Sequence, residues 1–311
     1  MTADITIVGV GLLGIAHMSR EAEDAVRTAR VVFCSTYNAG IAEHVRSLHP
    51  GVDLRSSEEN EYRVGMHRPD MYRRMATVVL DTAREGPGVV MLAPGSAVVI
   101  DLVTQLVLDG ARDAGLRARV LPGISSIESV LAEVQYDVSA GVQVVLAQKL
   151  VLQRKVLDPT AAAIVMQPAY FDTLHFAGAP CSRSGRFDAL EEQLARTWSR
   201  DVPMALVITP THGEPAASVF WLRLGSLGRA HRALSPRHTL FIPPERAAPV
   251  DDAFAARIGE WTELVSRVEV DDRGALRQQR RRDAATGALD VSAELLSESE
   301  LLAERWRSRA R

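Results

Sequence analysis

Two tyrosines and an arginine lie close together in the segment EYRVGMHRPDMYRRM, as Tyr62, Arg68 and Tyr72. An arginine is permanently charged, and a cation beside a tyrosine favours the phenolate form, which can accept a proton. A second tyrosine can donate a hydrogen bond to an oxygen on which negative charge develops. The set could therefore remove a proton and stabilise the resulting anion. Alternatively, Tyr72 could be a core residue of a helix, and the other two could be surface residues of a polar loop.

A helix is expected to carry the second tyrosine. Pro69 suits the first position of a helix, where its missing N–H costs nothing, and Gly86 follows the end of the pattern. Arg68 would then lie at the start of the helix over residues 69–84, with Tyr72 one turn further on. The other residues on the face of Tyr72 are apolar: Met75, Ala76, Val79 and Ala83.

The glycine-rich segment GVGLLG at residues 9–14 follows an apolar strand and matches the G-x-G-x-x-G pattern of dinucleotide sites. Such a site also needs a helix that begins at the glycines and an acidic residue about 20 positions on. Here the helical pattern begins only after Ser19, and the next strand, VVFC at 31–34, ends without an acidic residue. We expect a tight strand-to-loop turn, and a nicotinamide or flavin site remains the last alternative.

A second turn, LPGISS at residues 121–126, also follows a strand and precedes an expected helix. Ligands of open α/β sheets bind at the carboxyl ends of the strands, where this turn would present two hydroxyls and several backbone amides. The alternative is that Ser125 is an ordinary helix N-cap.

Three regions differ in their patterns. Strand-like and helix-like segments alternate over residues 1–128, which is typical of a mostly parallel sheet. Residues 129–250 hold further strand-like segments and a helix, and residues 251–311 are charged and helix-prone. We expect an N-terminal α/β domain (1–128), a C-terminal α/β domain (129–250) and a charged helical extension (251–311).

The composition is that of a soluble globular protein, with 311 residues, 47% hydrophobic, and a formal net charge of −3. No strong positive field recruits nucleic acid or an anionic membrane. The two cysteines, Cys34 and Cys181, make no disulfide framework, and no Cys/His cluster has metal-ligand spacing. A signal sequence and a long apolar run are both missing from the printed chain, so we expect a cytoplasmic protein without a bound metal.

Together these segments resemble the tetrapyrrole methylase superfamily, which transfers methyl groups from S-adenosylmethionine. Within it they are most similar to the borosin peptide backbone N-methyltransferases. Those enzymes carry a Tyr, an Arg six residues later and a Tyr four residues beyond, followed by a Met, and Tyr62, Arg68, Tyr72 and Met75 reproduce this spacing. The resemblance covers roughly residues 3–250 and includes these further segments: GVG at 9–11, the strand and loop at 89–99, GLRARVLPG at 115–123, the turn at 122–126, Gln167, and FIPP at 241–244.

The resemblance implies a tetrapyrrole methylase-like fold of two α/β domains with the cofactor cleft between them. It implies S-adenosylmethionine as the cofactor and Tyr62, Arg68 and Tyr72 as the catalytic residues. The residues expected to bind the cofactor are Gly95, Ser96, Val98, Val99, Ser125, Ser126, Gln167 and Thr209. One difference from the borosins lies in this set: Pro94 and Ser96 stand where those enzymes have Tyr and His.

A backbone amide nitrogen is a poor nucleophile because its lone pair is delocalised into the carbonyl. Its methylation requires removal of the N–H proton, stabilisation of charge on the carbonyl oxygen, and alignment of the methyl group with the nitrogen. The tyrosines and the arginine suit the first two requirements.

The resemblance also implies the partners. We expect a homodimer that acts on a ribosomally made precursor peptide. Some borosins carry their substrate as a C-terminal extension, but residues 251–311 lack a Val/Ile/Gly-rich core, so we expect a peptide supplied in trans. The alternatives are a methylase of a corrinoid, tetrapyrrole or other small natural product, and a non-catalytic binding protein of the same fold.

Overall fold

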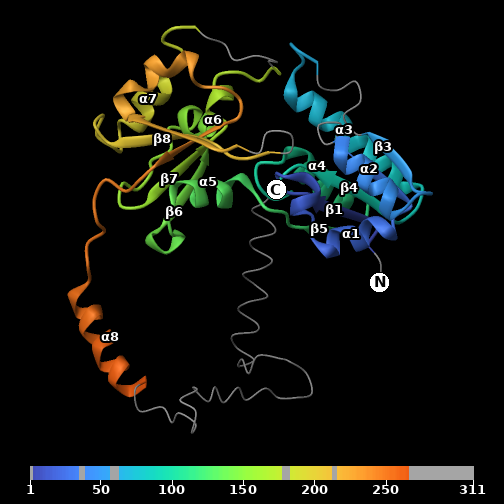
Figure 1. Ribbon diagram of the computed structural model, residues 1–311, viewed down its shortest axis with the longest axis horizontal. Helices are drawn as coiled ribbons and strands as arrows, with labels where there is room; N and C mark the ends of the chain where they lie inside the picture. Colours follow the sequence, from blue (N-terminus) through green and yellow to red (C-terminus); the bar gives the residue numbers. More distant parts are fainter. Residues whose placement is uncertain (1–2, 35–38, 57–62, 177–182, 212–215, 266–311) are drawn as a thin grey trace. The chain divides into compact units, whose positions relative to one another are not determined.

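The computed structural model describes residues 3–34, 39–56, 63–176, 183–211 and 216–265 (Figure 1). Residues up to Ala248 form one unit, and residues from Pro249 onward form another. The first unit contains two five-stranded sheets. In the second, the described residues include the helix α8 (Asp252–Val265).

The first sheet is parallel throughout, with the strand order β3-β2-β4-β1-β5. Its strands are β1 (Ile5–Gly9), β2 (Val31–Cys34), β3 (Asp53–Ser56), β4 (Val89–Ala93) and β5 (Ala118–Leu121). The helices that connect them are α1 (Arg20–Arg27), α2 (Ala39–Leu48), α3 (Arg68–Arg84) and α4 (Leu102–Asp113), with the short helix η1 (Gly14–His17) after β1. Because β1, β2 and β4 are buried on both faces, their sequences are almost uninterrupted runs of apolar residues.

Two apolar clusters cover the two faces of this sheet. Met75 and Val79 of α3 and Val107 of α4 pack on one face, against the strand residues Ile7 and Phe33. On the opposite face, the apolar residues of α1 and α2 pack against the alternate strand residues: Ala22, Ala25, Val26, Ile41 and Val45 against Val8, Val32, Val90 and Leu92. The alternation of strand side chains therefore produces three layers, with a pair of helices on each side of the sheet.

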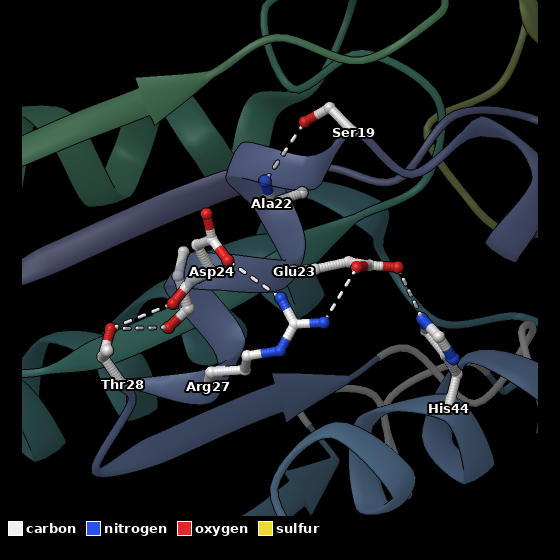
Figure 2. A network of polar contacts seen from close by, with 8 residues as sticks. Ser19, Ala22, Glu23, Asp24, Arg27, Thr28 and His44 are labelled. Atoms are coloured by element: carbon white, nitrogen blue, oxygen red, sulfur yellow. Dashed lines mark hydrogen bonds and ion pairs between the residues drawn. The ribbon is translucent and has the colours of Figure 1, made fainter.

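Polar contacts fix the helix α1 at its start and on its outer side (Figure 2). The Ser19 hydroxyl accepts a hydrogen bond from the amide of Ala22 at 3.1 Å and caps the helix. Glu23 lies between Arg27 of its own helix and His44 of α2, at 3.1 Å from each. The hydrogen bond from His44, together with the charge of Arg27, holds the pKa of Glu23 below its ordinary value.

The second sheet is mixed, with the strand order β6-β7-β10-β8-β9 and only the β6–β7 pair parallel. Its strands are β6 (Val142–Leu146), β7 (Ala162–Met166), β8 (Pro203–Ile208), β9 (Ser218–Arg223) and β10 (His238–Ile242). The helices around it are α5 (Ser126–Val134), η2 (Val138–Ala140), α6 (Ala147–Leu152), η3 (Pro168–Tyr170), α7 (Asp188–Leu194) and η4 (Leu224–Arg232). Apolar residues of α5 pack on one face, and those of α6, α7 and η4 pack on the other.

Three glycines meet at the carboxyl ends of the first sheet's strands: Gly9, Gly95 and Gly123. A Cβ atom on Gly123 would lie 2.4 Å from the carbonyl oxygen of Gly95 and 2.6 Å from that of Gly9. Gly11 pairs with Gly95 through backbone hydrogen bonds of 2.9 and 3.0 Å. Gly9 is therefore required by the close approach of three backbone segments, whereas Gly11 is required by its left-handed backbone, with φ of 73°, beside the His17 side chain.

The backbone amides of the next two residues, Leu12 and Leu13, already have a hydrogen-bond partner. The backbone N–H groups of Leu12 and Leu13 donate to Nδ1 of His17, at 3.2 and 3.3 Å. In a dinucleotide site, amides at this turn would instead face the pyrophosphate. Here the His17 side chain already accepts their hydrogen bonds, so these amides do not face a pyrophosphate. The segment therefore lacks this feature of a dinucleotide site as well.

We predict that Gly123→Ala lowers the free energy of unfolding by about 2–3 kcal/mol, because the new methyl group would overlap backbone atoms that cannot move away. Gly51→Ala is the matched control, since a Cβ there meets nothing within 4 Å. Urea unfolding of both variants measures the difference. Equal midpoints for the two variants would contradict the close contact of the three glycines.

Candidate active site

A cavity of about 340 Å³ lies in the first unit, at the carboxyl ends of β4, β6 and β7. Elements of both sheets contribute to its wall, which agrees with the general position of ligand sites in α/β proteins. The lining residues are Arg68, Pro69, Tyr72, Met75, Met91, Leu92, Ala93, Pro94, Val99, Ile100, Asp101, Leu102, Val103, Leu146, Gln148, Gln167, Tyr170 and Leu174. The sequence prediction included four of them: Arg68, Tyr72, Val99 and Gln167.

A short antiparallel ladder connects the segment before α3 to the segment after η3. Residues 65–68 and 174–176 form it, and we call it the crossing ladder. Its backbone hydrogen bonds run from Gly65 to Phe176, from Phe176 to Met66, and from Arg68 to Leu174, each at 2.8 Å. Because this ladder sets where α3 begins, it also sets where the first turn of α3 meets the cavity.

Arg68 is held at this first turn by both its backbone and its side chain. Its Nη2 donates to the carbonyl oxygen of Thr173 at 2.7 Å, and its guanidinium carbon lies 4.6 Å from the ring centroid of Tyr170. Its Nε is buried and has no hydrogen-bond partner among the described residues. Buried donors nearly always have a partner, so this N–H is a candidate contact for a bound ligand.

Tyr72 lies one turn further along α3, as the sequence predicts. It lines the cavity and packs, partly buried, against the apolar cluster that includes Met75. The third residue of the expected set, Tyr62, lies outside the described residues. The structure therefore brings Arg68 and Tyr72 to one cavity.

Tyr170 is, with Tyr72, the second aromatic residue that lines the cavity, and it was not among the residues predicted from the sequence. Burial raises the pKa of its phenol above the ordinary value, while the nearby Arg68 guanidinium opposes that rise. At neutral pH this phenol is therefore protonated and can donate a hydrogen bond. The available signal was its position three residues after Gln167, at the end of a buried strand.

The loop between β4 and α4 supplies one polar wall of the cavity. Ile100 has a left-handed backbone, with φ of 53°, and Asp101 caps α4. The Asp101 carboxylate accepts hydrogen bonds from the amides of Val103 (2.9 Å) and Thr104 (3.2 Å) and from the Thr104 hydroxyl (2.9 Å). Burial nevertheless raises the pKa of this carboxyl group above its ordinary value.

Gln167 also has a left-handed backbone, with φ of 52°, although Pro168 follows it. A residue before proline normally adopts an extended conformation, so this geometry is strained. Strain of this kind is common where a backbone is shaped for a ligand. The left-handed conformation of Gln167 turns the chain at the end of β7, where the residue lines the cavity.

The other residues expected to bind the cofactor do not line the cavity. Ser125 is buried and serves as the N-cap of α5, with its hydroxyl accepting from the amide of Ile127 at 3.1 Å and contacting Glu128. This is the alternative role that the sequence left open for it. The remaining five lie in three segments. Gly95, Ser96 and Val98 are on the loop after β4, Ser126 is the first residue of α5, and Thr209 follows β8.

Metal-binding clusters and membrane-spanning helices are both absent from the described residues. These residues contain no group of three His, Cys, Asp or Glu side chains placed to bind a metal ion. None of their helices is both long and apolar enough to cross a membrane.

The chain is similar to methyltransferases in both sequence and fold. A family model described as Tetrapyrrole (Corrin/Porphyrin) Methylases matches residues 4–209. A methyltransferase/ribosomally synthesized type I borosin cyclic peptide precursor from Mycena rosella is 25% identical over 272 residues, which are 82% of this chain and 64% of that protein. The chain thus spans less than two thirds of the length of that relative.

Two solved structures share the fold. The methyltransferase CobJ has a TM-score of 0.56 at 16% identity, over 79% of this chain and 96% of that one. The uroporphyrin-III C-methyltransferase of Thermus thermophilus, complexed with S-adenosyl homocysteine, has a TM-score of 0.52 at 19% identity, over 80% of this chain and 99% of that one. The chain belongs to the tetrapyrrole methylase family, and the expected fold class and family are confirmed.

We predict that Asp101→Asn raises stability at neutral pH relative to the unchanged protein. An acid with a raised pKa binds its proton more tightly in the folded state, so its contribution to stability falls as pH rises from the ordinary aspartate pKa through the raised value. Asparagine keeps the cap without the charge. Urea unfolding at acid and neutral pH gives the difference between the two proteins, which should grow with pH.

Asp101→Ala is the control for this measurement. It removes the cap as well as the charge, and the loss of the cap should cost about 1 kcal/mol at every pH. If Asp101→Asn shifts stability equally at both pH values, the buried carboxyl group does not titrate as described.

Proposed function

We propose that this protein is an S-adenosylmethionine-dependent methyltransferase that methylates backbone amide nitrogens of a ribosomally made precursor peptide. The observation that carries the proposal is the meeting of Arg68 and Tyr72 in one cavity of a tetrapyrrole methylase fold. The borosin relatives, whose names pair a methyltransferase with a peptide precursor, support the same substrate class.

The residues of the site suit the chemistry of an amide. Removal of the N–H proton leaves negative charge that is shared with the carbonyl oxygen. Arg68 offers a permanent positive charge and an unpartnered N–H to that oxygen. The two tyrosines of the proposed set, Tyr72 and Tyr62, divide the remaining roles: one accepts the proton and the other donates a hydrogen bond to the oxygen.

The cavity also has features that suit the cofactor, which supplies a methyl group on a positively charged sulfur. Met91, Leu146 and Val103 provide apolar surface, and Gln148 and Gln167 provide amide groups. We propose that Val99 and the strained backbone at Gln167 hold the cofactor inside the cavity. The rest of the proposed set lies outside the cavity lining and would contact parts of the cofactor that extend beyond it: Gly95, Ser96, Val98, Ser126, Thr209 and the backbone, not the capping hydroxyl, of Ser125.

The character of the wall favours a peptide over a tetrapyrrole. Tetrapyrrole precursors carry several carboxylates, and a site for them needs several cations. Among the described residues that line the cavity, Arg68 is the only cation, and most of the others are apolar. An uncharged amide flanked by apolar side chains suits such a wall better.

We further propose that the peptide is supplied in trans and that the enzyme is a cytoplasmic homodimer. Residues 251–311 are rich in charge and contain no Val/Ile/Gly-rich run, so this stretch is not itself the proposed substrate. Light scattering of the purified protein tests the dimer.

Intact mass spectrometry tests the reaction. We predict that the full chain, incubated with S-adenosylmethionine and a short precursor peptide encoded beside its gene, adds multiples of one methyl mass to the peptide. Fragmentation should assign these methyl groups to backbone nitrogens. Tyr72→Phe should slow the reaction about a hundredfold or more, because it removes a proton-transfer group.

Tyr136→Phe is the matched control, since its hydroxyl donates to the carbonyl oxygen of Gly141 at 3.3 Å and its residue does not line the cavity. If the methyl mass appears on the protein itself, the substrate is a segment of its own chain and not a separate peptide. Methyl transfer to a corrinoid but to no peptide would overturn the peptide proposal. Failure to bind S-adenosylmethionine by calorimetry would favour a non-catalytic binding protein.

A further inference from the structure

Tyr170 and Thr173 hold the Arg68 guanidinium from two sides. The aromatic ring covers one face of the group at 4.6 Å, and the carbonyl oxygen of Thr173 accepts from one edge at 2.7 Å. A face contact and an edge contact together restrict both tilt and rotation of a planar group. The Nε–H of the same group is buried without a partner among the described residues.

The segment that carries Tyr170 is itself anchored. The side chain of Arg186 is almost fully buried and forms a two-point ion pair with Asp172, with Nη2–Oδ1 at 2.7 Å and Nε–Oδ2 at 2.9 Å. The same Nη2 donates to the carbonyl oxygen of Ala169 at 2.6 Å. These contacts fix the residues on both sides of Tyr170, so its ring is a stable surface for Arg68 to rest on.

We propose that Tyr170 is a positioning residue, whose ring orients the Arg68 guanidinium so that its Nε–H points toward the substrate carbonyl oxygen. The inference rests on the proposed function for the identity of that oxygen. The hold on Arg68 itself is independent of the reaction. The hydroxyl of Tyr170 is not required for this role, because the contact is made by the face of the ring.

Substitutions at Tyr170 separate the ring from the hydroxyl. Tyr170→Phe keeps the face contact, so its kcat for peptide methylation should stay within about twofold of the unchanged protein. Tyr170→Leu removes the contact and should lower kcat about tenfold with little change in KM, since orientation matters most in the transition state. Tyr136→Leu is the matched control, because that tyrosine packs on Phe241 and not on an arginine.

A double variant tests whether Tyr170 acts through Arg68. In an Arg68→Lys background there is no planar group to orient, so adding Tyr170→Leu should cost less than about twofold. A tenfold loss that persists in this background would overturn the proposal. An equal loss in Tyr170→Phe and Tyr170→Leu would also overturn it, because the hydroxyl would then be the functional group.

Arginine side-chain NMR tests the same contact without turnover. The Nε–H signal that disappears in Arg68→Lys should be displaced from the other arginine signals by the ring, stay displaced in Tyr170→Phe, and return to them in Tyr170→Leu. Displacement without any methyl transfer to a peptide would refute the proposed function and keep the positioning role. Methyl transfer with an undisplaced signal would do the reverse.

Discussion

The crossing ladder is the constraint on which the candidate site depends. Its backbone hydrogen bonds join the start of α3 to the residues that follow η3, at 2.8 Å each. The two sheets of the unit each have their own apolar clusters. The ladder adds to this packing a set of directional bonds that specify where Arg68 lies relative to Tyr170. Packing therefore builds the two halves, and a few directional hydrogen bonds bring their chemistry together.

The same division explains how the polar groups of the site are arranged. Apolar burial is roughly proportional to area and has no preferred direction, whereas hydrogen bonds and ring contacts fix angles as well as distances. Arg68 has both kinds of directional contact, and Asp101 has three hydrogen bonds that hold it at the start of α4. Strained backbone occurs at Ile100 and Gln167, where the chain turns around the cavity.

The sequence predicted the local features of this fold well. Apolar runs located β1, β2, β4, β7, β8 and β10 to within a residue or two, because nearly all residues of these strands are buried. The edge strand β6 was also located, although it is only partly buried. The proline at the start of α3 and the serine caps of α1 and α5 located helix starts. The elements α2, β3, α6 and β9 were not predicted from the sequence. β3 and β9 lie at sheet edges and are largely exposed, so their apolar pattern is weak.

The parts of the site that depend on distant contacts were harder to predict. Tyr170 lies three residues after the predicted Gln167, but its role depends on Arg68, which is distant in sequence and is brought close to it by the crossing ladder. For Ser125 the sequence left two roles open, a ligand contact and a helix cap, and the geometry shows that its hydroxyl is a cap. The three clustered glycines were visible as residues, but their mutual contact required the register of β1, β4 and β5.

The bond between Arg68 and Thr173 joins residues 105 positions apart. All five strands of the first sheet are present in the chain once it reaches Leu121, whereas the crossing ladder needs residues up to Phe176. At ordinary rates of synthesis, the ribosome takes about 3 to 11 seconds to add the residues from Leu121 to Phe176. A nascent chain can thus hold a folded first sheet while Arg68 still lacks its partners, and the candidate site is assembled only after the second half emerges.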